Sequence, residues 1–189
     1  MGGATDHIVD LIERLGRVAR SARYAEGMKP AQWEALRFLA RANKLSRTPG
    51  TVADFLSTTR GTVSQTLIAL EKKGFVKRMA DRGDARIKRL ELTKSGYAVV
   101  ERDPLHVLED AVASIGDKPG LAENLELILR EIIHHNGNHR FGVCLGCRHF
   151  RSNGSRNQAK GPHLCSLSGE ILTDVDSAQI CREHEVRAA

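Results

Sequence analysis

The sequence predicts a mainly α-helical protein with one small β-hairpin and a separate C-terminal tail. Apolar residues recur at intervals of three and four through most of the first 137 residues, which is the period of helices with one buried face. Two short runs, "FVKRM" and "RIKRLEL", enclose the polar turn "ADRGDA", and this arrangement predicts the hairpin. All four cysteines follow residue 143, in a stretch with little periodicity.

The composition narrows the classes of function. With 189 residues, 41% of them hydrophobic, the chain is large enough for one packed domain and an appendage. The formal net charge is +6, and residues 57–89 alone hold nine basic residues against three acidic ones. This local excess favours a polyanionic partner such as nucleic acid. A basic helix face that merely contacts solvent is the simpler alternative.

The sequence gives no indication of a membrane partner. The start, "MGGATDHIVD", lacks a basic segment followed by an apolar one, as a secretory signal would require. No later segment approaches the roughly 18 apolar residues of a membrane span. We therefore expect a cytoplasmic protein.

The first two helices are predicted from their apolar stripes. In residues 6–22, Ile8, Leu11 and Leu15 follow helical spacing and place one apolar face along a long helix. Residues 29–42, "KPAQWEALRFLARA", begin with a proline that suits a first helical turn. Both segments are therefore predicted to be amphipathic helices.

A short helix and a longer one follow. The turn Arg47–Gly50 leads into "TVADFL", and residues 57–74, "STTRGTVSQTLIALEKKG", then form the most informative stretch of the first half. Thr59 is placed to accept hydrogen bonds from the first turn, and Gly74 is placed to end the helix. The predicted buried stripe consists of Val63, Leu67 and Leu70.

The opposite face of this longer helix carries polar and mostly short side chains in its first two turns. Such side chains let a helix approach a groove closely and can hydrogen-bond to base edges or phosphates. Three helices followed by a basic hairpin form a winged helix-turn-helix, so we expect double-stranded DNA as the partner. The predicted DNA-contacting residues are Thr59, Arg60, Thr62, Ser64, Gln65, Lys72, Arg78, Arg82 and Arg86.

Helical periodicity returns in residues 92–116 and 119–137, interrupted by Pro104 and by the Gly116–Gly120 turn. Together with the first helix, these segments offer more apolar surface than a small winged helix can bury. This surplus predicts a homodimer, although packing within one chain is the alternative. The predicted boundaries are 1–28 for an N-terminal dimerisation helix, 29–93 for the DNA-binding domain, 94–138 for C-terminal dimerisation helices and 139–189 for the cysteine-rich tail.

The order of these segments resembles the MarR family of winged-helix transcription regulators over roughly residues 5–135. "TVSQTLIALEKKGFV" is similar to the family's recognition helix and its exit, "LTKSG" to the entry of its fifth helix, and Asp81, Asp84 and Arg86 to its wing pattern. The chain departs from the pattern at the wing tip, where Gly83 stands in place of the usual arginine and Arg82 comes one position early.

The resemblance implies a homodimer whose two recognition helices enter successive major grooves of a near-palindromic operator, commonly as a repressor. It also implies a possible small aromatic effector between the dimerisation helices and the winged helix. Trp33 and Phe38 are candidates for lining such a pocket, but a role in the core is favoured for both. Most family members end with the sixth helix, so the tail is an added module.

The cysteines of the tail follow the spacing C-x2-C-x17-C-x15-C. A CxxC pair can bind one metal ion or one edge of a cluster, and two distant cysteines can complete a four-sulfur shell. We therefore predict metal ligation, and we favour it over a disulfide switch or inert thiols. The predicted ligands are Cys144, Cys147, Cys165 and Cys181.

The nature of the metal is less constrained by the sequence. The wide, irregular spacing favours an iron–sulfur cluster, [4Fe–4S] or [2Fe–2S], whereas tetrathiolate zinc is the more common use of four cysteines and stays as the alternative. Arg148, Arg151 and Arg182 are expected to offset the charge of the thiolates. Three histidines near the cysteines are candidate replacement ligands, but a supporting or exposed position is favoured for each: His149, His163 and His184.

These observations predict a DNA-binding regulator, most simply a repressor, whose DNA affinity depends on a redox- or iron-sensing cluster. The alternative is a repressor with a structural zinc tail that responds to a small aromatic ligand. An enzyme is not expected, because the H-x-E of zinc deaminases is missing and a lone CxxC has no βαβ setting here. If the tail packs on the first or last predicted helix, loss of the cluster changes the recognition-helix spacing, which must stay near about 34–36 Å.

Overall fold

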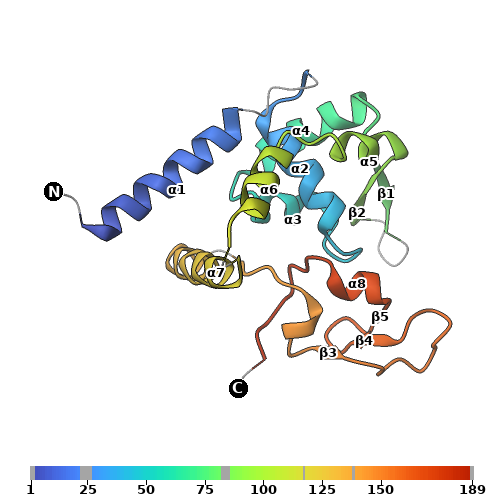
Figure 1. Ribbon diagram of the computed structural model, residues 1–189. Coiled ribbons are helices and arrows are strands. Elements are labelled where there is room, and N and C mark those ends of the chain that lie inside the picture. The colour runs from blue at the N-terminus through green and yellow to red at the C-terminus, as the bar shows by residue number, and fades with distance from the viewer. Residues whose placement is uncertain (1–2, 22–26, 82–85, 117, 138, 188–189) are drawn as a thin grey trace.

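The computed structural model describes residues 3–21, 27–81, 86–116, 118–137 and 139–187. It consists of a winged-helix body, a long N-terminal helix that projects from it, a further long helix, and a separate C-terminal module (Figure 1). The fold is mainly helical, with one two-stranded and one three-stranded sheet. The predicted fold class is therefore confirmed for the first two thirds of the chain.

The winged-helix body has its elements in the predicted order. Helices α2 (Pro30–Arg41), α3 (Pro49–Phe55) and α4 (Arg60–Lys72) precede strands β1 (Val76–Ala80) and β2 (Lys88–Leu92). The strands pair antiparallel, with Val76 opposite Leu92. The turn between them includes Arg82 and Gly83, which lie outside the described residues, so the prediction for Arg82 stays a prediction.

One apolar core holds this body together. Its centre consists of α2 and α4 side chains that are almost fully excluded from solvent, and β1, β2 and α5 close it from one side. Trp33 is 0% exposed and Phe38 is 1% exposed, so both have the role in the core that the sequence favoured. The stripe predicted for the recognition helix is also buried: Val63, Leu67 and Leu70.

The helix α5 (Lys94–Val100) explains the glycine of "LTKSG". Thr93 Oγ1 accepts a hydrogen bond from the Gly96 amide at 3.0 Å and so caps the helix. A Cβ atom at position 96 would overlap the carbonyl oxygen of Phe75. Glycine is therefore needed for the close approach of α5 to the start of the wing.

The helical stretch 92–116 is broken at Pro104, as the sequence predicted, into α5 and a second helix. Asp103, 6% exposed, pairs with Arg37 of α2 at 2.8 Å and accepts a hydrogen bond from the Leu105 amide at 2.9 Å. Helix α6 (His106–Ser114) then begins in a new direction, and α7 (Lys118–His135) follows it. The break is thus fixed to the body by one partly buried ion pair.

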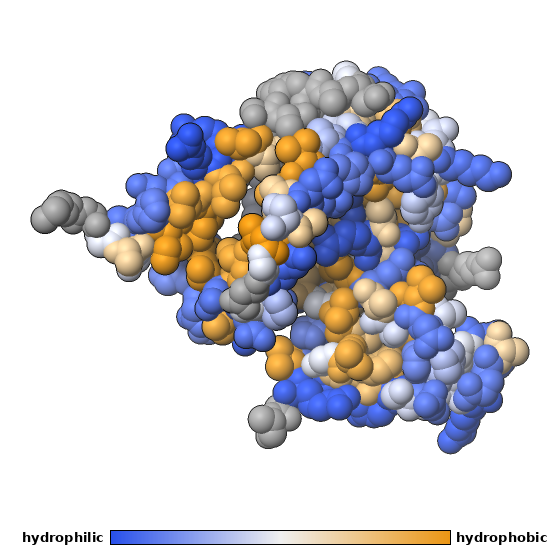
Figure 2. Space-filling view, viewed as in Figure 1, coloured by the Kyte–Doolittle hydropathy of each residue, from blue (hydrophilic) through white to orange (hydrophobic). Residues whose placement is uncertain are grey.

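Apolar side chains on α1 (Ala4–Ser21), α6 and α7 are exposed in the single chain. Those of α1 form an orange band in Figure 2, and no residue of α6 or α7 is buried. This is a larger apolar surface than a monomer usually presents to water. The large residues concerned are Ile8, Val9, Leu11, Ile12, Leu15, Val18, Val107, Leu108, Val112, Leu121, Leu125, Leu127, Ile128, Leu129 and Ile132.

In the described part of the chain, no helix has both the length and the apolar character that crossing a membrane requires.

The C-terminal module, residues 139–187, contains more regular structure than the sequence predicted. Strands β3 (Phe150–Arg151), β4 (His163–Cys165) and β5 (Ile171–Leu172) form an antiparallel sheet in the order β3-β4-β5, beside a 3₁₀ turn (Cys144–Gly146) and the helix α8 (Asp174–Ala178). Strands of two or three residues are too short to show an alternating pattern. The sequence analysis missed the sheet for this reason.

Candidate nucleic-acid interface and cysteine cavity

The first turns of α4 present the polar face that the sequence predicted. Thr59 Oγ1 accepts from the Thr62 amide at 3.1 Å, which fixes the start of the helix. Thr59, Arg60, Thr62 and Gln65 are exposed, whereas Ser64 is only partly exposed. Because α4 buries its other face in the core, this polar face points outward in a fixed orientation. It is accessible to a groove of DNA.

The basic residues around this face differ in availability. Lys72, in the last turn of α4, is exposed, and so is Arg86, which follows the undescribed wing tip. Arg78 Nε lies 3.0 Å from Glu71 Oε1. This ion pair neutralises part of the charge that the sequence analysis assigned to DNA contact, so Arg78 is a weaker candidate than Lys72.

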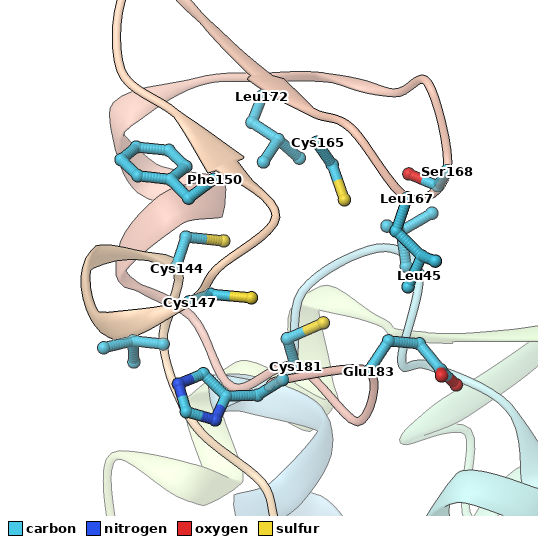
Figure 3. Close-up of a pocket in the computed structure, with 12 residues that line it drawn as sticks. Leu45, Cys144, Cys147, Phe150, Cys165, Leu167, Ser168, Leu172, Cys181 and Glu183 are labelled. Carbon is cyan, nitrogen blue, oxygen red and sulfur yellow. The ribbon is translucent and has the colours of Figure 1, made fainter. Parts of the chain in front are cut away.

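The four cysteines of the module line one cavity. Figure 3 shows their sulfurs directed toward a common space, with Phe150 and Leu172 behind them. None of the four is in a disulfide, and Cys165 is the most exposed of them. Leu45, from the connection between α2 and α3, and His184 also line this cavity. The clustering of the four cysteines, predicted only from their spacing, is thus present in the fold.

Three separate segments bring these cysteines together. The 3₁₀ turn, closed by a 2.9 Å hydrogen bond from the Cys147 amide to the Cys144 carbonyl, positions the CxxC pair. Cys165 ends β4, and its amide donates to the Glu170 carbonyl at 2.9 Å. Cys181 exchanges two backbone hydrogen bonds with Gly142, at 2.8 and 3.2 Å.

Gly142 also has a packing reason to be glycine. A Cβ atom at position 142 would stand 2.7 Å from the His184 ring. The backbone therefore passes directly under the imidazole, which closes one side of the cavity.

Among the residues that the structure describes, no three cysteine, histidine or acidic side chains are placed to hold one metal ion. Burial, which is the largest cause, and the neighbouring Cys181, Cys147 and Cys165 together raise the pKa of the Cys144 thiol to about 12. Several thiolates in this cavity therefore require a compensating cation.

The arginines beside the cysteines form ion pairs and hydrogen bonds. Arg148 Nε pairs with Glu185 at 3.1 Å, Arg151 donates to the Arg148 carbonyl at 2.7 Å, and Arg182 Nε pairs with Asp54 at 2.7 Å. These contacts do not test the expectation that these arginines offset thiolate charge, and it stays a prediction. Each guanidinium fixes a segment of chain.

The three histidines fall into two groups. His163 Nε2 lies 3.0 Å from Asp174 Oδ1, and His149 Nε2 lies 3.1 Å from Glu185 Oε1. His184 alone of the three lines the cavity, and burial lowers its pKa, so the neutral ring is favoured. His163 and His149 are therefore supporting residues, as favoured from the sequence.

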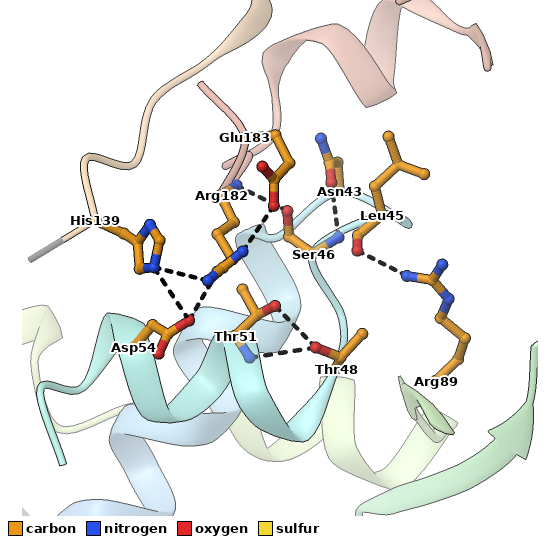
Figure 4. A network of polar contacts seen from close by, with 10 residues as sticks. All are labelled: Asn43, Leu45, Ser46, Thr48, Thr51, Asp54, Arg89, His139, Arg182 and Glu183. Carbon is orange, nitrogen blue, oxygen red and sulfur yellow. Dashed lines mark hydrogen bonds and ion pairs between the residues drawn. The ribbon is translucent and has the colours of Figure 1, made fainter. Parts of the chain in front are cut away.

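The module docks on the connection between α2 and α3, residues 42–48, and on α3 itself (Figure 4). Asn43 donates its amide to the Ile180 carbonyl at 2.9 Å, and the Ile180 amide donates to the Arg41 carbonyl at 2.8 Å. Lys44 Nζ pairs with Glu170 at 2.9 Å. The condition that the tail packs on the first or last long helix is thus not met by these contacts, which lie on the helix-turn-helix.

Sequence reasoning missed the residues on the body side of this contact. Asp54 and Arg182 are 128 positions apart, and the Arg182 amide donates to Ser46 Oγ at 2.9 Å across a similar distance in sequence. Asp54, Ser46 and Leu45 carry no local motif that distinguishes them from ordinary helix and turn residues. Only the tertiary fold brings them to the cysteines.

The fold and these surfaces define a winged-helix protein with an appended cysteine module. Residues 26–87, about a third of the chain, match the model of the MarR family. No curated protein is a significant match to the chain. The cysteine module lies outside the matched residues.

Solved structures share the fold over 69% of this chain. An S. aureus MepR–DNA complex is 23% identical, with a TM-score of 0.54 and 99% of that chain covered. A MarR transcriptional regulator from Methanosarcina mazei Go1 is 20% identical, with a TM-score of 0.55 and 96% of that chain covered. BldR, a transcriptional regulator from Sulfolobus solfataricus, is 18% identical, with a TM-score of 0.53 and 99% of that chain covered.

Proposed function

We propose that this protein is a DNA-binding transcription regulator that acts as a homodimer, most simply as a repressor. The observation that carries the proposal is the outward-facing polar start of α4, held on a buried apolar stripe and followed by a basic wing. The match of residues 26–87 to the MarR family and the likeness to a protein solved with DNA support it.

The exposed apolar faces of α1, α6 and α7 support the dimer. A second copy is the simplest cover for them, because a two-fold axis pairs the same apolar patch with itself. The two recognition helices of such a dimer would read two half-sites of a near-palindrome.

The module is proposed to hold an iron–sulfur cluster on Cys144, Cys147, Cys165 and Cys181. A single zinc ion would take all four sulfurs about 2.3 Å from one point, whereas a cluster takes the same four thiolates around a wider core. The cavity that all four cysteines border and their wide, irregular spacing along the chain support a cluster, and tetrathiolate zinc is the alternative. When bound, the cluster would make the module sensitive to iron availability or to oxidants. Its irons would also provide the positive charge that buried thiolates need.

The DNA-binding proposal is tested by titrating the protein against the promoter of its own operon at several salt concentrations. Binding should weaken steeply with salt because lysine and arginine contacts release condensed counterions. Lys72→Ala should weaken all sequences alike and reduce the salt slope by about 1, whereas Gln65→Ala should change base preference by about 1–3 kcal/mol. Lys160→Ala, an exposed lysine of the module, is the matched control. A flat salt dependence would contradict the proposal.

The cluster is tested separately by measuring iron, sulfide and zinc in protein purified without oxygen. We expect a coloured protein that contains iron and sulfide, and a colourless Cys147→Ser variant. Ser166→Ala, beside Cys165, is the control and should keep both colour and iron. A colourless wild-type protein with one zinc per chain would contradict the cluster and would leave DNA binding untouched.

A further inference from the structure

The hinge loop, defined here as residues 42–47 of the connection between α2 and α3, is bonded to the cysteine module along one side. The Asn43 amide donates a hydrogen bond to the Ile180 carbonyl, and the Ser46 hydroxyl accepts one from the Arg182 amide. Asn43 and Ser46 are each 1% exposed, so these bonds are shielded from water. The module therefore supplies hydrogen-bond partners to polar groups of the hinge loop that are buried in the folded chain.

Arg182 strengthens this side of the contact. Its Nε lies 2.7 Å from Asp54 on α3, and its Nη2 lies 2.7 Å from His139 Nε2. Arg182 directly follows Cys181, and Leu45 of the hinge loop lines the cysteine cavity. A change in the position of Cys181 must therefore move groups that touch both α3 and the hinge loop.

The other side of the hinge loop is bonded to the wing. Arg89 of β2 donates to the Leu45 carbonyl at 2.7 Å, and its Nε pairs with Asp81, at the end of β1, at 2.6 Å. The Leu90 amide donates to the Arg47 carbonyl at 2.8 Å. One short loop thus lies between the cysteine cavity and both strands that carry the wing.

We propose that the cysteine module controls DNA affinity through the hinge loop, holding α3 and the wing in position within one subunit, rather than by changing the spacing of the two subunits. This inference rests on the proposed function, because it concerns how the metal-loaded module acts on DNA binding. The ordered module holds the hinge loop, which presents the wing in its DNA-binding position. Loss of the metal frees the module, and with it the partners of Asn43, Ser46 and Asp54.

The loaded protein should therefore bind the operator more tightly than the metal-free protein. In the loaded protein the wing is already positioned before DNA binds. Less conformational entropy is therefore lost on binding than in the metal-free protein, and the affinity is higher. The ratio of the two dissociation constants should lie in the range of about 5 to 150, as for other coupled sites.

The test measures this ratio by fluorescence anisotropy on one operator at fixed salt, for wild-type protein and three variants. Arg182→Gln removes the ion pair with Asp54, and Arg89→Lys keeps the charge of the wing but loses the fork that joins Leu45 to Asp81. Arg148→Gln is the matched control, because Arg148 also directly follows a cysteine but pairs with Glu185 of the module itself. Metal content is measured in every sample.

In Arg182→Gln and Arg89→Lys, the ratio should fall at least about threefold while the metal content is unchanged. In Arg148→Gln, the ratio should equal that of wild type. An unchanged ratio in both hinge-loop variants would overturn the route through the hinge loop. If the dissociation constants of loaded and metal-free wild-type protein are equal, the module is not a sensor. The proposal of DNA binding is then unaffected, because the salt dependence tests it separately.

A second measurement needs no variant. Hydrogen exchange of the Asn43 amide reports the bond to Ile180, and that of the Leu90 amide reports the bond to Arg47. On metal removal both should exchange faster, whereas the Phe75 amide, bonded to the Leu70 carbonyl within the body, should not. Faster exchange confined to α1 and α7, with Asn43 and Leu90 unchanged, would support control through subunit spacing and overturn the proposal.

Discussion

The winged-helix body and the cysteine module differ in how they exclude water. The body buries aromatic and aliphatic side chains from α2, α4 and the wing in one continuous core around Trp33 and Phe38. The module buries Cys144 and Cys147 with Phe150 and Leu172, and little else that is apolar. Half of that small cluster is thiol, so we expect the module, unlike the body, to depend on the metal or cluster proposed for its cysteines.

The largest expected effect follows from removing the metal that we propose for the module. Chelation should unfold the module while the body stays folded, since binding free energy becomes folding free energy in small metal-dependent domains. The Cys165 amide, bonded to Glu170 within the sheet, should lose about 1,000-fold in hydrogen-exchange protection, or about 4 kcal/mol. The Phe75 amide of the body serves as the internal control. Equal protection of Cys165 before and after chelation would show that the module folds without metal.

Shortening one buried leucine in each region should test whether the body and the module are stabilised independently. Leu36, 0% exposed, and Leu172, 1% exposed, are equally buried. Leu36→Ala should lower the unfolding free energy of the body by about 2–5 kcal/mol, with or without metal. Trp33 is the only tryptophan and lies in the body, so its fluorescence during urea unfolding reports the body alone.

Leu172→Ala should leave that Trp33 transition unchanged and should release metal at a lower urea concentration than wild type. A shift of the Trp33 transition by Leu172→Ala as large as that by Leu36→Ala would mean that the two regions unfold as one unit. The body and the module would then share one source of stability.

The smallest expected effect comes from two matched helix caps. Thr93 caps α5 in the body and accepts from the Gly96 amide at 3.0 Å, while Thr173 caps α8 in the module and accepts from the Asp176 amide at 3.1 Å. Each change to alanine should cost about 1 kcal/mol. Thr93→Ala should shift the Trp33 unfolding transition in both metal states. Thr173→Ala should alter only the urea concentration at which metal is released. If it shifts the Trp33 unfolding transition of the metal-free protein, the two regions are not independently stable.

Much of the body could be predicted because its determinants are local. The stripe Val63, Leu67 and Leu70, the cap Thr59 and the turn after Gly74 all lie within one helix and its ends. The break at Pro104 was also visible in the sequence, whereas its attachment to α2 through Arg37 and Asp103 was not. In the module, the cysteine spacing indicated a common site, but the short strands β3 to β5 carried no detectable period.

The sequence by itself determined the order of the helices, the wing, the polar face of α4 and the grouping of four cysteines, because each depends on residues close together along the chain. Only the tertiary structure decided where the module docks. The contact joins Arg182 to Asp54 and Ile180 to Asn43, pairs more than 100 positions apart. Ordinary polar groups pair wherever the packing of larger surfaces brings them together, so no local pattern records which ones will meet.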